Sequence, residues 1–456
     1  MKNLQAGSRA PPHACLNETE EVGIMKKGSD WSNAPEIRCT AKSDGHHHRF
    51  SRGYIAAALI SLALFGCGGG SDDASTGNAT TQSSSASGSA QTGTGSGDAK
   101  RVMGTDTNSA AAILSKMGRT GRVQIGLGSG QSIDDMKAQG IRPDIVDVYL
   151  VGVGSGAWPS WNSPTGAYVT YQAKNAISYG ATPMFTLYGM AQRGDSNLSG
   201  INDPSFMNDY WSQARTMYDR INELDTAVLV NLEPDFWPYV YAQAPNHDMT
   251  QMPAVINNQP ECSWMANTAA NIGSCLVSMA RWHAPKALIG FPPAFWNATP
   301  DVFAKQMQLV GADRADFIVA QTSDRDAGCL ELAQLDECKG RTGPFYLDEN
   351  NVNTPNFHQQ QNSYSAYRDA LGNGLPILWW QTPLGVASDT PGGTPNHFRD
   401  NHVDYMLRNT WEYGGMHTFA IVFGGGGTYS TNINTDGGQF ARLFGQYLTS
   451  GGVAAF

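Results

Sequence analysis

Two closely spaced carboxylates, Glu233 and Asp235, have the surroundings that acid–base chemistry requires. They follow an apolar run within the stretch NLEPDFW (231–237), so two aromatic residues come directly after them. Burial beside Phe236 and Trp237 would raise the pKa of a carboxyl group, because burial disfavours its charged form. Such a group can donate a proton near neutral pH. We therefore expect Glu233 to be a general acid; the alternative is a structural carboxylate paired with an arginine.

A second carboxylate is needed if the proton is delivered to a glycosidic oxygen, since that reaction commonly uses a pair of carboxyl groups. The candidates are Asp235 and Asp324, which follows another apolar run in QTSDRD (321–326). An Asp across the site could be the base of an inverting enzyme, at a separation of about 6.5–9.5 Å. The alternative is that Asp324 pairs with Arg325 or caps its loop.

Aromatic and amide residues are concentrated at the ends of the other apolar runs. Aromatic faces can stack on the C–H faces of sugar rings, and amides can bind hydroxyl groups. Some of these tryptophans could instead fill a core, and of the neighbours Trp379 and Trp380 only one can point inward, since side chains alternate along a strand. The candidate substrate-binding residues are Tyr149, Trp158, Tyr188, Trp237, Trp296, Gln321, Trp379 and Gln381.

Eight strand-like runs alternate with eight helix-like segments from residue 121 onward. The strands are expected at 123–128, 144–152, 182–189, 227–234, 287–293, 316–323, 376–383 and 417–424. The helices are expected near 132–140, 168–180, 204–224, 265–283, 300–311, 358–371, 397–413 and 437–449. Continuous apolar runs are typical of parallel strands covered on both faces.

This alternation predicts an α/β fold with a single (β/α)8 TIM barrel over residues 106–456; an open doubly wound sheet is the alternative. Long insertions follow the second, fourth and sixth strands, at 153–167, 235–262 and 324–357. Loops of this kind gather at the C-terminal face of the barrel, which is where active sites of this fold lie.

The end of the fourth strand resembles the acid/base signature of clan A glycoside hydrolases, in which an Asn-Glu-Pro run supplies the general acid. The resemblance is carried by Asn231, Glu233 and Pro234, with Leu232 inserted where the family has Asn and Glu adjacent. It implies a glycoside hydrolase with Glu233 as its acid/base. The family carries its second Glu at the end of the seventh strand, where this sequence has Gln381. That departure favours a second hypothesis, a carbohydrate-binding barrel without catalysis.

Four cysteines fall in the barrel region: Cys262, Cys275, Cys329 and Cys338. An even number in an exported chain indicates disulfides, and four cysteines allow three connectivities. We favour the local pairs Cys262–Cys275 and Cys329–Cys338, because each would close one loop insertion. Four free thiols are the alternative.

The N-terminal part of the chain carries an export signal. A short apolar run at 54–66 follows Arg49 and Arg52 and ends at Cys67, in a pattern that resembles the bacterial lipobox. The resemblance implies that Cys67 is lipidated. Residues 1–67 are thus expected to be an N-terminal extension and lipoprotein signal peptide, and the Gly/Ser/Thr-rich residues 68–105 a disordered tether. The expected location is the cell envelope, with a lipid anchor as the membrane contact.

Several other classes of function are disfavoured. The formal net charge is −10 with no basic stripe, so nucleic acid is not expected as a partner. There is no G-x-S-x-G elbow, and the only strand histidine, His417, lies at the wrong end for a catalytic metal. A third hypothesis, a phosphate-binding barrel, comes from the glycines at 424–427. We expect a monomer that acts on carbohydrate and uses no cofactor or metal.

Overall fold

The eight predicted strands form one closed barrel in the computed structural model, which describes residues 109–119, 121–128, 131–322, 327–334, 338–385, 400–425 and 431–456. Every neighbouring pair is parallel, and β1 closes the ring by pairing with β8. The (β/α)8 prediction is confirmed. The strands are β1 (Gln124–Leu127), β2 (Ile145–Val151), β3 (Thr182–Tyr188), β4 (Val228–Leu232), β5 (Ala287–Phe291), β6 (Phe317–Gln321), β7 (Ile377–Thr382) and β8 (Thr418–Phe423).

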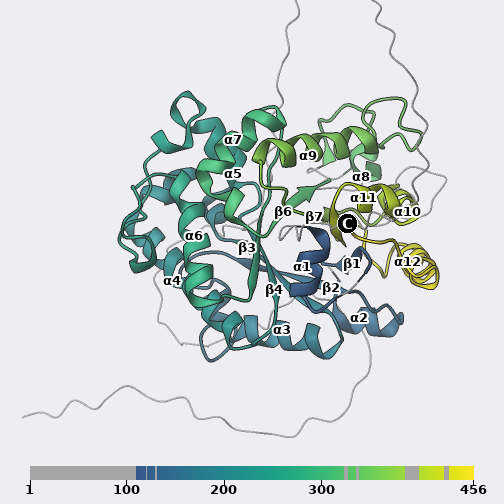
Figure 1. The fold of residues 1–456 in the computed structure, drawn as a ribbon, viewed down its shortest axis with the longest axis horizontal. Helices are drawn as coiled ribbons and strands as arrows, with labels where there is room; N and C mark the ends of the chain where they lie inside the picture. The colour runs from purple at the N-terminus through teal and green to yellow at the C-terminus, as the bar shows by residue number, and fades with distance from the viewer. Residues whose placement is uncertain are drawn as a thin grey trace, which may run out of the picture. The chain divides into compact units, whose positions relative to one another are not determined.

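Helices surround the barrel, as Figure 1 shows. Those that follow the strands are α2 (Ile133–Ala138), α3 (Ala167–Ser178), α4 (Pro204–Asn222), α6 (Ala270–His283), α7 (Pro300–Val310), α9 (Phe357–Leu371), α10 (His402–Arg408), α11 (Thr410–Gly415) and α12 (Gln439–Thr449). The helix predicted over 397–413 is therefore two helices, with the non-helical Asn409 between them. The short helices α1 (Ala110–Lys116), α5 (Phe236–Gln243) and α8 (Ala327–Leu332) were not predicted.

The strands bury both of their faces, which explains their continuous apolar sequences. On β4, Val228, Val230 and Leu232 belong to the large core between strands and helices, whereas Leu229 belongs to a separate core inside the barrel. This alternation is the ordinary period of a strand. It decides which side chains near a strand end can face the barrel mouth.

Helix α1 closes the N-terminal end of the barrel. Its Ile113 and Leu114 pack with the interior side chains of the strands, and α1 lies across the centre of the barrel in Figure 1. Just after α1, Arg119 donates hydrogen bonds to the carbonyl oxygens of Gly180 (2.6 Å) and Asp144 (3.3 Å), which precede β3 and β2. Since α1 occupies this end, the opposite, C-terminal end is left for a ligand.

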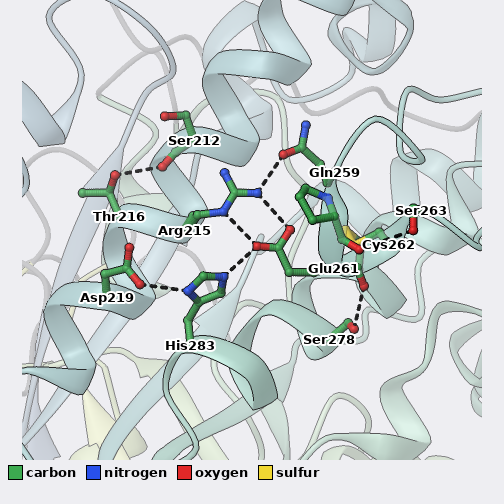
Figure 2. A network of polar contacts seen from close by, with 12 residues as sticks. Ser212, Arg215, Thr216, Asp219, Gln259, Glu261, Cys262, Ser263, Ser278 and His283 are labelled. Atoms are coloured by element: carbon green, nitrogen blue, oxygen red, sulfur yellow. Dashed lines mark hydrogen bonds and ion pairs between the residues drawn. A yellow bond between two sulfur atoms is a disulfide. The ribbon is translucent and has the colours of Figure 1, made fainter.

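A buried polar network fixes the insertion after β4 to the outer helices (Figure 2). Arg215 of α4 donates to both carboxylate oxygens of Glu261, at 2.8 and 2.9 Å. His283 of α6 contacts the same carboxylate at 2.6 Å and Asp219 of α4 at 2.9 Å. Only 3% of Glu261 is exposed, and the Arg215 contact holds the pKa of its carboxyl group down at about 2. The network therefore links two helices and the insertion through one carboxylate.

Both predicted disulfides are confirmed. Cys262 is bonded to Cys275 of α6, beside the Glu261 network, and Cys329 of α8 is bonded to Cys338. The first lies in the large core, whereas the second forms a small cluster of its own with Leu330. The two bonds therefore secure different insertions, those after β4 and β6.

Replacing both Cys262 and Cys275 by serine is expected to lower the free energy of unfolding by about 2–4 kcal/mol, because the bond closes a short loop that the unfolded chain would otherwise open. Urea unfolding of the purified protein measures this. The matched variant Cys329→Ser/Cys338→Ser should cost less in the global transition, since its cluster is separate from the large core. Equal losses in the two variants would contradict this ranking.

Part of the predicted organisation lies outside the described residues. This applies to Cys67, to the extension at 1–67 and to the tether at 68–105. Within the described ranges, no helix is both long enough and apolar enough to cross a membrane.

Candidate active site

Glu233, predicted to be the catalytic acid, is fully buried directly after the end of β4. Its carboxylate accepts hydrogen bonds from the backbone N–H groups of Gly189 (3.0 Å) and Met190 (2.9 Å), just beyond the end of β3, and none of the residue is exposed. The neighbouring ring is that of Tyr210, on the outer helix α4. Burial raises the pKa of Glu233 to about 7, and the two N–H groups partly offset this rise.

The backbone explains the direction of Glu233. Leu229 lies in the barrel interior and Asn231 hydrogen-bonds to the interior Thr186, so strict alternation would point residue 233 inward as well. Glu233 instead has a φ of +56°, in the left-handed region that breaks the alternation. A carboxylate buried against the turn after β3 has no atom exposed at the mouth in this structure. The assignment of Glu233 as the acid stays a prediction.

Glu233→Gln is expected to leave the free energy of unfolding at pH 7 unchanged or higher, because burial raises the pKa of Glu233 to about 7, so that ionisation of this carboxyl group opposes folding and an amide avoids that cost. The folded variant should keep kcat within about 10-fold of the wild type. Thermal unfolding and initial rates, measured below the melting temperature of both proteins, test this. A variant that melts like the wild type but has a 100-fold lower kcat would show that Glu233 acts as the acid.

Asp147, which the sequence analysis did not single out, lies inside the barrel. Its carboxylate accepts hydrogen bonds from the indole N–H of Trp380 (2.8 Å), across the barrel on β7, and from the hydroxyl of Thr186 (3.0 Å) on β3. Gly128 lies against it, and a Cβ at that position would come within 2.8 Å of the Asp147 Cβ. Burial raises the pKa of Asp147 to about 6, against the lowering effect of the Trp380 and Thr186 donors.

Two partly exposed tyrosines lie beyond Asp147 toward the mouth. Tyr149 and Tyr188 contact each other edge to face at 6.0 Å between ring centroids, and Tyr149 also contacts Trp380 at 5.8 Å. Burial and the negative charges of Asp147 and Asp235 raise the pKa of Tyr149.

Two carboxylates approach Tyr188 from different loops. Burial raises the pKa of Tyr188, and the charges of Asp235 and Asp195 add to this. The Tyr188 hydroxyl donates to Asp195 at 2.7 Å. The half-buried Asp235 therefore lies within electrostatic reach of both tyrosines, and its catalytic role stays a prediction.

The structure separates the predicted tryptophans into core and surface residues. Trp158, Trp237 and Trp379 are fully buried and unavailable for stacking on a sugar, which corrects these three assignments. Trp379 points outward and packs against Tyr364 and Tyr413 of the helical layer, so its neighbour Trp380 is the inward member of the pair.

Trp296 is the predicted tryptophan that remains accessible. It is 49% exposed, in the loop after β5, and it contacts Tyr239 of α5 at 4.9 Å between ring centroids. Its ring can therefore receive a ligand from the mouth side.

The two predicted amides lie at neighbouring strand ends. Gln321 ends β6 on the side of its interior residues Phe317 and Val319 and is half-buried. Gln381 of β7 has a φ of +52° and donates to the Tyr149 hydroxyl at 3.4 Å. The structure thus brings Gln381 to Tyr149, whereas the predicted Asp324 lies outside the described residues.

The described part of the chain contains no evident metal-binding site. No group of three or more His, Cys, Asp and Glu side chains there is arranged to hold an ion.

Comparisons with known proteins found similarity in structure only. No family model and no curated protein sequence matches the chain. A trimodular endo-β-1,4-glucanase from Bacillus halodurans aligns with a TM-score of 0.43 and 10% identity, over 73% of this chain and 61% of that chain. A GH113 β-1,4-mannanase aligns at 0.44 and 9%, over 73% and 100%. A D-allulose 3-epimerase from Methylomonas sp. aligns at 0.36 and 12%, over 72% and 98%.

Proposed function

We propose that this protein is a glycoside hydrolase in which Asp147 and Asp235, rather than Glu233, are the catalytic carboxylates. The observation that carries the proposal is that the Asp147 carboxylate is held inside the barrel by Thr186 and Trp380, and that the Trp380 ring also contacts the partly exposed Tyr149 at the C-terminal end of the barrel. Two carboxylates beside an aromatic ring and the amide of Gln381 provide what a glycosidic bond needs: an acid, a base and a surface for the sugar.

The two carboxylates differ in their surroundings, and this suggests their roles. Asp147 is buried, and its pKa of about 6 keeps part of its population protonated near neutral pH, so it supplies the acid. Asp235 is half-buried at the end of β4 and acts as the base or nucleophile. Trp380 and Thr186 hold the Asp147 carboxylate in place, while Tyr149 and Trp296 offer rings to the sugar.

The first experiment is a reducing-sugar release screen of the purified protein over β-glucans, mannans, xylans and α-glucans, with the Asp235→Asn variant beside it. We expect release from one class of polymer and a loss of at least about 100-fold in the variant. Asp195→Asn is the comparison, since Asp195 already accepts the Tyr188 hydroxyl, and it should cost less. Equal activity in the wild type and Asp235→Asn would refute the proposed role of Asp235.

A carbohydrate-binding protein without catalysis is the second candidate. It is favoured by the burial of Glu233 and by Gln381 at the end of β7, which leave both carboxylate positions of the clan A pattern without an acid at the mouth. Affinity electrophoresis through gels that contain the same polymers separates the two functions. Retardation without any release of reducing sugar would favour the binding protein.

We also propose that the chain is a monomer in the cell envelope, anchored by a lipid on Cys67. The support is the apolar run that ends at this cysteine and the polar Gly/Ser/Thr-rich stretch after it. Full-length protein expressed in a bacterial host should enter the detergent phase on Triton X-114 partition, and Cys67→Ser should move it to the aqueous phase. A wild-type protein found in the aqueous phase would exclude the anchor.

A further inference from the structure

A hollow beside the barrel mouth is lined entirely by uncharged residues. Its volume is about 440 Å³, within the range of ordinary ligand sites. The lining comes from the loop between β3 and α4, from the end of α5 and from the segment after it, all of which are βα connections on the C-terminal face. The lining includes Ser196, Leu198, Ser199, Ile201, Asn202 and Gln243.

The chemistry of this lining suits a neutral sugar chain. Leu198 and Ile201 are buried and form an apolar base, whereas Ser196, Asn202 and Gln243 are exposed and present hydroxyl and amide groups. Apolar contacts with C–H faces and amide contacts with hydroxyl groups are the pairing that carbohydrate requires. The lining residues themselves carry no charge, and Arg193, which contacts Ser199 from outside the lining, is already paired with Asp203.

The polar side chains around the hollow are already held in position. Gln243 donates to the backbone oxygen of Ser196 at 2.8 Å, which joins the end of α5 to the loop after β3. Asn197 accepts from the Ser199 N–H at 3.1 Å, and Arg193 donates to the Ser199 hydroxyl at 3.3 Å. A site whose groups are fixed before binding loses less entropy when a ligand arrives.

Residues that line the hollow lie close in sequence to residues of the proposed catalytic site. Ser196 directly follows Asp195, which accepts the hydroxyl of Tyr188 at the mouth. On the other side, Gln243 ends the helix that begins one residue after Asp235. A ligand that stacks at the tyrosines would therefore reach the hollow along the β3–β4 side of the barrel.

We propose that this hollow is an extended subsite for a neutral polysaccharide, so that the protein acts within polymer chains rather than on short sugars. The proposal rests on the function proposed above and adds to it the class of substrate and the side on which the chain lies.

The test compares a long and a short substrate. For the polymer cleaved in the screen, kcat/KM is measured on its hexasaccharide and on its disaccharide aryl glycoside. Ser196→Trp, which fills the hollow, should lower kcat/KM on the hexasaccharide at least about 10-fold and leave the aryl glycoside within about 2-fold. Gln243→Ala should give a smaller loss of the same kind, about what one hydrogen bond contributes. Ser178→Trp, on an exposed face of α3, is the matched control.

Binding provides a second readout that does not need turnover. In affinity electrophoresis through hydroxyethyl cellulose, galactomannan or xyloglucan, the wild type should be retarded and Ser196→Trp should migrate freely. Cleavage with equal kcat/KM ratios in wild type and Ser196→Trp would overturn the subsite alone. A protein that neither cleaves nor binds any polymer would overturn the proposed function and the subsite together.

Discussion

Asp147→Asn is expected to lose at least about 100-fold in kcat without losing stability at pH 7. The loss follows from removing a carboxyl group that we assign as the acid. The retained stability follows from its burial. The folded pKa of about 6 lies above the ordinary value of 3.8 for an aspartate, so ionisation of Asp147 opposes folding. This cost is absent below pH 3.8, grows up to about pH 6 and amounts to about 3 kcal/mol above it.

The asparagine variant has no such cost, so at pH 7 it should melt at or above the wild-type temperature. Asp134→Asn is the matched control, because Asp134 is an exposed carboxylate on α2 and should change neither rate nor stability. A variant that loses activity only in proportion to a lower melting temperature would show that Asp147 is structural.

The pH profile of the wild-type enzyme should carry the signature of the same group. If Asp147 donates the proton, kcat should fall on the alkaline side with an apparent pKa near 6. The Trp380 N–H stabilises the ionised carboxylate, so Trp380→Phe should shift this limb to higher pH. An alkaline limb that stays in place in Trp380→Phe would contradict the role of this hydrogen bond.

The fold could be predicted from the sequence because its signal is repeated eight times. Each apolar run is ambiguous alone, but a parallel strand covered on both faces needs a continuous run, and eight runs in alternation with helices fit a closed barrel. Helix α1 was missed because its seven residues precede the repeat. Its apolar face becomes interpretable only when the open end of a barrel is present to receive it.

The site was harder to predict because it depends on side-chain direction. Glu233 has the expected sequence context, but one positive φ turns it from the interior toward α4. Conversely, Asp147 is a charged residue in the middle of the strand run DIVDVYLVG, at 144–152, whose other charge, Asp144, lies at its start. A charge that must be buried in a strand needs partners, and this signal could have identified it. Its partner Trp380 lies 233 residues away, so spacing alone could not reveal the contact.

Glu261→Gln is expected to lower the free energy of unfolding by about 3 kcal/mol at pH 7. The substitution removes the negative charge that both Arg215 and His283 contact. It leaves the Arg215 guanidinium facing a neutral amide in a buried position. Since the folded pKa of Glu261 is about 2 and the ordinary value for a glutamate is 4.5, the contribution of the carboxylate to stability is complete above pH 4.5. It is lost as the pH falls from about 4.5 toward 2. The difference in stability between wild type and variant should therefore shrink across that window.

The exposed pair Arg220–Glu223 on α4 supplies the matched control for this prediction. It is the same pair of residue types at 2.8 Å, but the Glu223 side chain is 49% exposed. Glu223→Gln should change stability by less than about 1 kcal/mol, because solvent screens an exposed ion pair. Urea unfolding at pH 7 and at pH 3 compares the two variants. Similar losses in both, or a Glu261→Gln loss that does not change with pH, would show that the insertion after β4 is held by its disulfide and apolar contacts instead of by this carboxylate.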